Sequence, residues 1–134
     1  MALAGHTSNA ADLDGLNIMV VEDDYFVAHE LARVLREHRA QVLGPVPDVA
    51  RSRALLFGGA PDCVLLDINL RGEMAFDLAA ELIGRGIPTI FTTGYDPSIV
   101  PASLRRAPCL QKPIEKHDLV GMVRSQTRAT GAGA

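Results

Sequence analysis

The sequence predicts an α/β domain in which a five-stranded parallel sheet is covered by helices on both faces. Three observations support this prediction. Five short apolar runs alternate along the chain with segments of helical periodicity. A segment long enough for a helical crossover separates each run from the next, as parallel strands require. The 134 residues suffice for one domain, and a hydrophobic share of 48% with few aromatics fits an aliphatic α/β core.

The central element is the apolar run over residues 63–66, which ends at Asp67. The run is too short for an independent helix and lies between a proline and a glycine, so we predict a strand buried on both faces. A carboxylate where such a strand ends faces the crevice in which open α/β sheets bind ligands. Considered alone, Asp67 could equally cap the following turn.

The first predicted strand covers residues 16–21 and ends in three consecutive carboxylates at positions 22–24. A helix follows, and Asp24 is its expected N-cap. The inner face of this helix has apolar residues at helical spacing: Ala28, Leu31, Ala32 and Leu35.

A second strand is predicted over residues 41–43, where Gly44-Pro45 ends it. Asp48 is a suitable N-cap for the second helix, which ends at Gly58-Gly59. We expect the inner face of this helix to include Ala50, Ala54 and Phe57.

After the Asp67 strand, a third helix with a clear apolar stripe ends at Gly84 and Gly86. The stripe consists of Ala75, Leu78, Ala79 and Leu82. A fourth strand is predicted over residues 87–92, continuing into the turn 93–95.

The fourth predicted helix has residues that favour its first turn and a proline that disfavours its interior. Asp96 can cap it and Pro97 suits its first position. Pro101 falls inside the helix, where a proline costs roughly 3 kcal/mol. We therefore expect this helix to be short, bent or mobile. A fifth strand over residues 109–111 follows, and a last helix has Leu119, Met122 and Val123 on one face.

Reactive side chains collect at one edge of the predicted sheet, because right-handed crossovers place the carboxyl ends of all five strands together. The residues at that edge are Glu22, Asp23, Asp67, Thr93 and Lys112. Three carboxylates in a partly desolvated cleft repel one another, and Mg²⁺ is the hard cation that suits them. An ammonium group can pair with a phosphoryl oxygen while a carboxylate attacks phosphorus, forming an aspartyl phosphate.

Composition and charge exclude other classes of function. A net charge of -3 provides no basic surface for nucleic acid. No apolar run approaches the roughly 20 residues of a membrane span. We expect residues 1–14 to be a disordered leader and not a signal peptide, residues 15–127 to form the domain, and residues 128–134 to be a disordered tail. The expected location is cytoplasmic.

Four motifs, in order, resemble the receiver domain of bacterial two-component response regulators. They are Val-Val-Glu-Asp-Asp after the first strand, Leu-Leu-Asp-Ile-Asn-Leu-Arg-Gly at the third, Phe-Thr-Thr-Gly-Tyr at the fourth and Gln-Lys-Pro at the fifth. The resemblance covers about residues 16–127. It implies a flavodoxin-like (CheY-like) sheet with strand order 2-1-3-4-5.

The resemblance also implies a role for each matching residue. Asp67 corresponds to the phosphoacceptor. Asp67, Asp23 and the main-chain carbonyl of Asn69 correspond to direct ligands of Mg²⁺, for which Mn²⁺ can substitute, and Glu22 acts on the metal through water. Lys112, followed by Pro113, corresponds to the phosphate-pairing lysine.

The resemblance leaves two candidates for the hydroxyl switch. Thr93 is preferred to Thr92 because it lies five residues after Pro88, the spacing of the family. Gly94 and Tyr95 are secondary candidates, and Tyr95 occupies a place that borders the path of the hydrolytic water in the family.

Two features depart from the commonest receiver pattern. The position three residues before Lys112, often aromatic in the family, is Cys109 here. Residues 91–95 resemble the Phe-Ala-Thr-Gly-Tyr variant of a subfamily of mostly stand-alone receivers.

The expected function is that of a single-domain response regulator that takes a phosphoryl group from a histidine kinase or a histidine phosphotransfer protein. It would act as an enzyme only in catalysing its own phosphorylation and slow hydrolysis. It would signal through an unknown protein target or drain phosphate, as a monomer or weak dimer. The alternative is a constitutive pseudo-receiver, an interaction module that is never phosphorylated.

Overall fold

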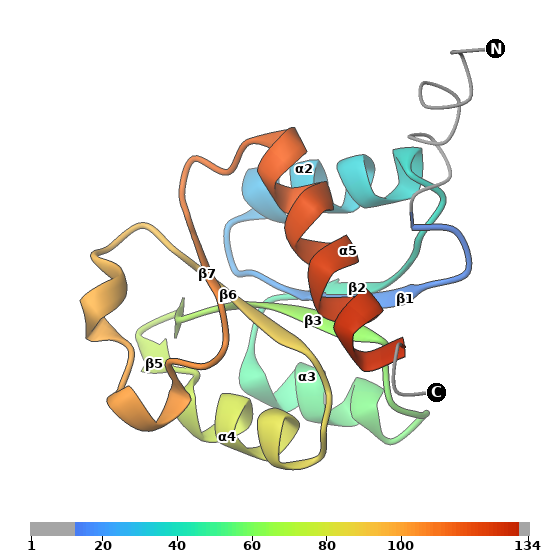
Figure 1. The fold of residues 1–134 in the computed structure, drawn as a ribbon. Helices are drawn as coiled ribbons and strands as arrows, with labels where there is room; N and C mark the ends of the chain where they lie inside the picture. The colour runs from blue at the N-terminus through green and yellow to red at the C-terminus, as the bar shows by residue number, and fades with distance from the viewer. Residues whose placement is uncertain (1–12, 132–134) are drawn as a thin grey trace, which may run out of the picture.

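A parallel sheet of five strands forms the centre of the molecule (Figure 1). The computed structural model describes residues 13–131, with side chains described through residue 127. The strands of the sheet are β1 (Asn17–Val21), β2 (Gln41–Val46), β3 (Cys63–Asp67), β6 (Thr89–Thr93) and β7 (Cys109–Gln111). Their order across the sheet is β2-β1-β3-β6-β7, so the predicted fold class and strand order are confirmed.

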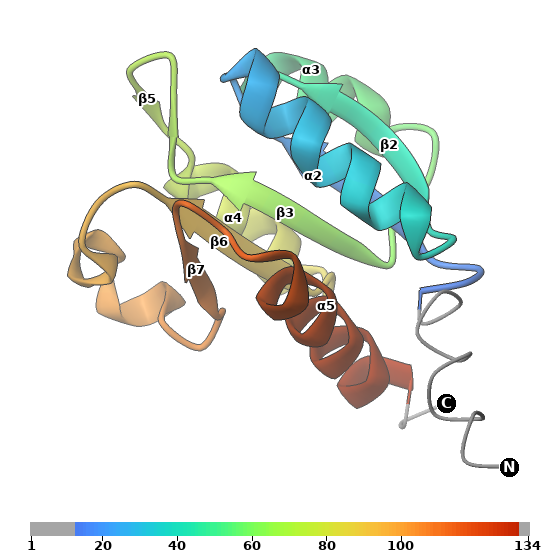
Figure 2. The same ribbon diagram turned by 90° about the horizontal axis from the view of Figure 1, so that it is seen from above.

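Helices cover both faces of this sheet. Helices α2 (Tyr25–Glu37) and α5 (Lys116–Gly131) lie on one face, and α3 (Val49–Leu56) and α4 (Phe76–Gly84) lie on the other (Figures 1 and 2). Within residues 13–131, no helix has both the length and the apolar character needed to cross a membrane.

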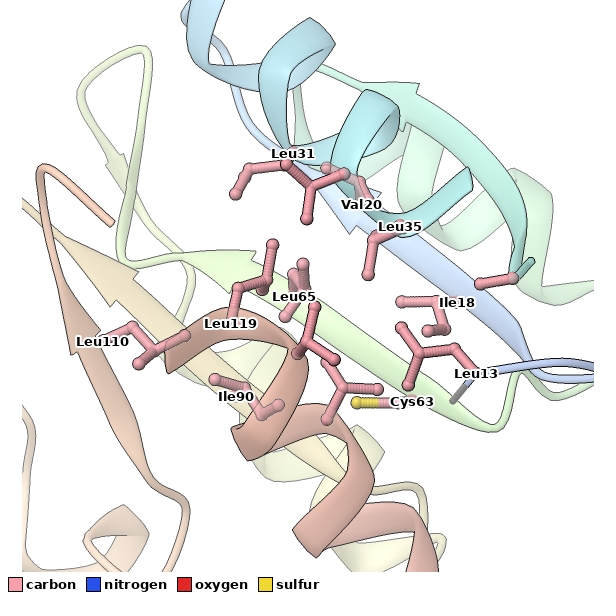
Figure 3. Packing of buried hydrophobic residues seen from close by; sticks show 14 residues of the cluster. Leu13, Ile18, Val20, Leu31, Leu35, Cys63, Leu65, Ile90, Leu110 and Leu119 are labelled. Atoms are coloured by element: carbon pink, nitrogen blue, oxygen red, sulfur yellow. The ribbon is translucent and has the colours of Figure 1, made fainter. Parts of the chain in front are cut away.

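Each inner strand supplies side chains to two cores, because successive residues of a strand point to opposite faces. On β3, Leu65 packs with α2 and α5, whereas Val64 and Leu66 pack on the side of α4. Figure 3 shows Leu65 among side chains that come from α2 and α5, including Leu31 and Leu119. The prediction that β3 is buried on both faces is confirmed.

The prediction for the inner face of α3 is wrong. Ala50 and Ala54 are exposed, and the side chain of Phe57 is 92% exposed. The residues that face the core are Val49, Ser52, Leu55 and Leu56. The buried hydroxyl of Ser52 donates to the carbonyl of Asp48 at 2.8 Å, which removes the cost of placing this polar residue inward. The sequence interpretation followed apolar residues alone and therefore selected the wrong stripe.

Strand β2 is longer than predicted, since it passes through Gly44 and ends at Val46. Gly44 has φ +92°, and a Cβ atom there would lie 2.8 Å from the backbone nitrogen of Val46, so glycine is required. The carbonyl of Val46 accepts from the N–H of Glu22 at 2.9 Å. The extension of β2 thereby fixes the backbone at the end of β1.

Two 3-10 turns, Pro97–Ile99 and Ala102–Leu104, replace the fourth predicted helix, with Pro101 between them. Asp96 caps the first turn through the N–H of Ser98. The guanidinium of Arg105 donates to the carbonyls of Val100 and Ser98, at 2.9 and 3.1 Å. A side chain thus satisfies carbonyls that a continuous helix would pair internally.

Described structure continues past the predicted boundaries, residues 15 and 127, at both ends. Leu13 is fully buried in the core, and its N–H donates to the carbonyl of His38. Helix α5 continues to Gly131, inside the predicted tail 128–134. The remaining predicted leader and tail residues, 1–12 and 132–134, lie outside the described residues. A short hairpin of β4 (Asn69–Leu70) and β5 (Glu73–Met74) was not predicted.

The two-sided core makes a direct stability prediction. Leu65→Ala should lower the free energy of unfolding by about 2–5 kcal/mol, because the cavity it leaves is surrounded by packed side chains. Ala54→Gln should change it by less than about 0.5 kcal/mol, because Ala54 faces solvent. Urea unfolding of both variants measures these values, and a large loss for Ala54→Gln would contradict the observed orientation of α3.

Candidate functional site

A cavity lies at the carboxyl-end edge of the sheet. In Figure 2 the arrowhead of β3, the β4–β5 hairpin and the start of α2 meet at this end. Residues from the ends of β1 and β3, from the hairpin, and from the turns after β6 and β7 line it: Glu22, Asp23, Asp24, Asp67, Asn69, Arg71, Gly72, Gly94, Tyr95 and Lys112. Four carboxylates and two cations therefore share one cavity, although they are far apart in the sequence.

Three carboxylates form a compact cluster within this cavity. One oxygen from each of Glu22, Asp23 and Asp67 lies within 4.8 Å of the others. Glu22 and Asp67 are buried, with 2% and 5% of their surface exposed, and Asp23 is half-buried. Hard oxygen donors at this spacing fit a small divalent cation such as Mg²⁺, whose charge would offset their repulsion.

The ammonium group of Lys112 contacts two of these carboxylates. Its Nζ lies 2.8 Å from Oδ2 of Asp67 and 2.7 Å from Oε1 of Glu22. Burial acts to lower the pKa of Lys112, but the hydrogen bonds and charges of Asp67 and Glu22 outweigh it, so the pKa is raised and the group stays charged. A fixed cation beside Asp67 is suited to pair with an anionic oxygen of a phosphoryl group.

Among the carboxylates of the cavity, Glu22 has a clearly raised pKa. Burial raises its pKa from 4.5 to about 7, and the charge of Asp67 acts in the same direction. Hydrogen bonds from Lys112 and from the N–H of Asp24, the latter at 3.0 Å, oppose the shift without cancelling it. Glu22 therefore takes up a proton more readily than an exposed glutamate, even with Lys112 beside it.

Backbone N–H groups of the β4–β5 hairpin orient the acidic side chains. The N–H of Asn69 donates to Oδ1 of Asp67 at 3.1 Å, and the N–H of Arg71 donates to Oδ2 of Asp23 at 2.9 Å. The side chain of Asn69 accepts from Gly72 at 3.0 Å and closes the turn. The contribution of Arg71 was missed from the sequence, since Leu-Arg-Gly there indicates only a turn.

The two candidate switch threonines are both buried at the end of β6. Oγ1 of Thr93 accepts from the N–H of Tyr95 at 2.9 Å, and its carbonyl accepts from the N–H of Lys112 at 2.7 Å. A hydroxyl that accepts through a lone pair keeps its proton free to donate. Among the described residues, Oγ1 of Thr92 has no hydrogen-bond partner. Thr93 is thus the threonine connected to residues of the cavity.

The predicted residues after β6 and β7 differ in whether they line the cavity. Gly94 and Tyr95 line the cavity, whereas Pro113, Thr92 and Thr93 do not. Asp24 lines it as well, but its Oδ1 accepts from the N–H of Val27 at 3.1 Å. The prediction that Asp24 caps the first helix is confirmed.

Comparison with known proteins is consistent with this arrangement. The family model of the response regulator receiver domain matches residues 18–124. The sensory transduction protein LytR of Streptococcus agalactiae is 32% identical over 108 residues, which cover 75% of this chain and 44% of that protein. This chain spans about half the length of the curated relatives it matches.

Solved structures show the same fold. SdrG from Sphingomonas melonis Fr1 superimposes with a TM-score of 0.74 at 32% identity, covering 86% of this chain and 97% of that one. A CheY-like response regulator receiver domain protein from Methanospirillum hungatei JF-1 has a TM-score of 0.77 at 20% identity, covering 89% and 98%.

The raised pKa of Glu22 makes the stability of the protein depend on pH. Well below pH 4.5, Glu22 is protonated in both folded and unfolded chains; as the pH rises from 4.5 to about 7 the unfolded chain ionises first, so the fold loses stability. Glu22→Gln removes this loss. Without divalent cations, the variant should gain on the order of 1 kcal/mol over the wild type between these pH values, allowing for partial solvation.

Urea unfolding at both ends of that pH range measures the effect. Glu73→Gln, which replaces an exposed glutamate of the hairpin, is the matched control and should show no such gain. If the free energy of unfolding differs between Glu22→Gln and the wild type by the same amount at both pH values, the pKa of Glu22 is not raised in the folded protein.

Proposed function

Because the chain belongs to the response regulator receiver domain family, we propose that it accepts a phosphoryl group on Asp67 in a Mg²⁺-dependent reaction. The observation that carries the proposal is the placement of Asp67. Its carboxylate shares a compact acidic cluster with Glu22 and Asp23 while it contacts the Lys112 ammonium at 2.8 Å. One edge of the sheet thus holds a carboxylate suited to attack phosphorus, carboxylate ligands for a metal ion, and an ammonium group that can pair with phosphoryl oxygens.

The proposed donor is a phosphohistidine of a histidine kinase or of a histidine phosphotransfer protein, since receiver domains interact with these proteins. An oxygen of Asp67 forms the new bond to phosphorus as the phosphorus–nitrogen bond breaks, and the imidazole leaves with that electron pair. Lys112, already held beside Asp67, pairs with an oxygen of the transferring group. Hydrolysis of the aspartyl phosphate later restores the carboxylate.

Asp23, Asp67 and the main-chain carbonyl of Asn69 are the proposed ligands of Mg²⁺ or Mn²⁺, with Glu22 acting through water. When bound, the ion supplies positive charge that offsets the carboxylates and the phosphoryl oxygens. Support for these residues comes from the three clustered carboxylates, which one ammonium leaves with excess negative charge.

Thr93 is the proposed hydroxyl that reports the phosphorylated state. Its Oγ1 accepts from the N–H of Tyr95, which leaves its proton free for a phosphoryl oxygen. Thr92, Gly94, Tyr95 and Pro113 are proposed as secondary residues around this contact.

We propose that the domain acts in the cytoplasm, as a monomer or weak dimer. The phosphorylated form either binds a downstream protein or serves as a phosphate sink. Membership of the Phe-Ala-Thr-Gly-Tyr subfamily is part of this proposal and rests on residues 91–95.

Phosphorylation can be tested by intact mass after incubation with acetyl phosphate and Mg²⁺. The wild type should gain one phosphoryl group, and Asp67→Asn should gain none because the attacking oxygen is replaced. Asp62→Asn, at the opposite end of β3, is the matched control and should behave as the wild type. Chelation of the divalent cation should abolish the gain. A wild type that never gains mass would favour a pseudo-receiver.

A second experiment tests Tyr95, which is 56% exposed and lines the cavity. If the ring restricts the approach of water to the aspartyl phosphate, Tyr95→Ala should lose its phosphate several-fold faster. The decay of phosphorylated protein after removal of acetyl phosphate gives the rate. Tyr25→Ala removes an exposed tyrosine that does not line the cavity and should leave the rate unchanged. Equal lifetimes in Tyr95→Ala and wild type would assign Tyr95 a packing role only.

A further inference from the structure

We infer that Gln111 is a positioning residue that holds Tyr95 at the mouth of the cavity. Gln111 is the last residue of β7 and pairs with Thr93, the last residue of β6. Its side-chain Nε2 donates to the main-chain carbonyl of Tyr95 at 3.2 Å. This contact joins the turn after β6 to the strand that leads to Lys112.

The hydrogen bonds between β6 and β7 explain why a side chain is needed there. The two strands exchange the evenly spaced bonds of a parallel pair, including Phe91 N–H to Pro108 O and Lys112 N–H to Thr93 O. Continued by two residues, this ladder would take the N–H of Tyr95 to the carbonyl of Lys112 and the carbonyl of Tyr95 to the N–H of Ile114. The strands end before those bonds form.

Two side chains replace the missing bonds. Oγ1 of Thr93 accepts from the N–H of Tyr95 at 2.9 Å, and the amide of Gln111 donates to its carbonyl at 3.2 Å. Both backbone groups of Tyr95 are therefore held by side chains of the last residue pair of the sheet. Tyr95 is more than half exposed, so packing contributes little there and these two bonds hold its backbone.

The chemistry of the contact requires a donor of the length of glutamine. A carbonyl oxygen only accepts, and the glutamine side chain supplies an amide N–H₂ that reaches it. Glutamate has the same length but, when ionised, no donor, and its charge would repel the carbonyl. Gln111 is exposed, so its replacement removes no core packing.

The consequence for the site concerns water, and this step rests on the proposed function. A ring held at the cavity mouth restricts the approach of water to an aspartyl phosphate on Asp67, whereas a ring on a loose turn restricts it less. Gln111 acts only through Tyr95. Its loss should therefore shorten the lifetime of the phosphate when the Tyr95 ring is present and have no effect when the ring is absent.

The contact itself is tested without phosphate, by amide hydrogen exchange measured by NMR. Gln111→Ala and Gln111→Glu should increase exchange at the N–H of Tyr95 on the order of tenfold, because local opening of the turn becomes easier. Exchange at Phe91, inside the sheet, should not change. Gln41→Ala, at an exposed glutamine of the opposite edge strand, is the control and should leave Tyr95 as in the wild type. Unchanged exchange at Tyr95 in both Gln111 variants would overturn the inference.

The effect on phosphate lifetime is tested by a double-variant comparison. Gln111→Ala should hasten decay of the phosphorylated protein several-fold in the wild-type background and leave it unchanged in the Tyr95→Ala background. Equal acceleration in both backgrounds, or none in the first, would overturn the positioning role. If the wild type accepts no phosphate, the proposed function fails, and raised exchange at Tyr95 still supports Gln111 as the residue that holds the turn.

Discussion

The candidate site depends on one contact, that of the Lys112 ammonium group with two buried carboxylates. Lys112, at the end of β7, reaches past β6 to contact Asp67 at the end of β3 and Glu22 at the end of β1. These contacts tie three strands together at the edge where their backbone bonds cease. Burial raises the pKa of Glu22, and the hydrogen bond from the ammonium does not cancel this shift. Lys112 thus links the three strand ends, and its single positive charge faces two carboxylates.

The strands around this contact are held differently from the segment that follows β6. The inner strands are buried on both faces, and their ends are fixed by backbone bonds such as that from Glu22 to Val46. Beyond β6 the backbone hydrogen bonds lie within the short turns and in the pairing with β7, and side chains add contacts such as those of Gln111 with Tyr95 and of Arg105 with Val100. Glu22 and Asp67 therefore lie at the ends of buried inner strands, whereas Tyr95 lies in the turn after β6.

The parts of the fold that the sequence predicted are those with strong apolar patterns. The run at residues 63–66 and the stripe containing Leu78 and Leu82 are both buried as expected. The inner face of α3 was not predictable in this way because Ser52 is buried through a local hydrogen bond. The β4–β5 hairpin has strands of two residues each, too short to show a period. The charged residues of the site could be predicted because each of them follows a recognisable strand. The proposed role of Gln111 could not, because it depends on the residue pair at which β6 and β7 stop pairing.

The two hydrogen bonds that Arg105 donates have a consequence for how this region can change during evolution. Between β6 and β7, one guanidinium donates to two carbonyls, and Val100 and Leu104 are buried. None of these bonds belongs to the sheet. Substitutions of Arg105 can therefore alter the surface of this flank without removing a hydrogen bond of the sheet or a residue that lines the acidic cavity.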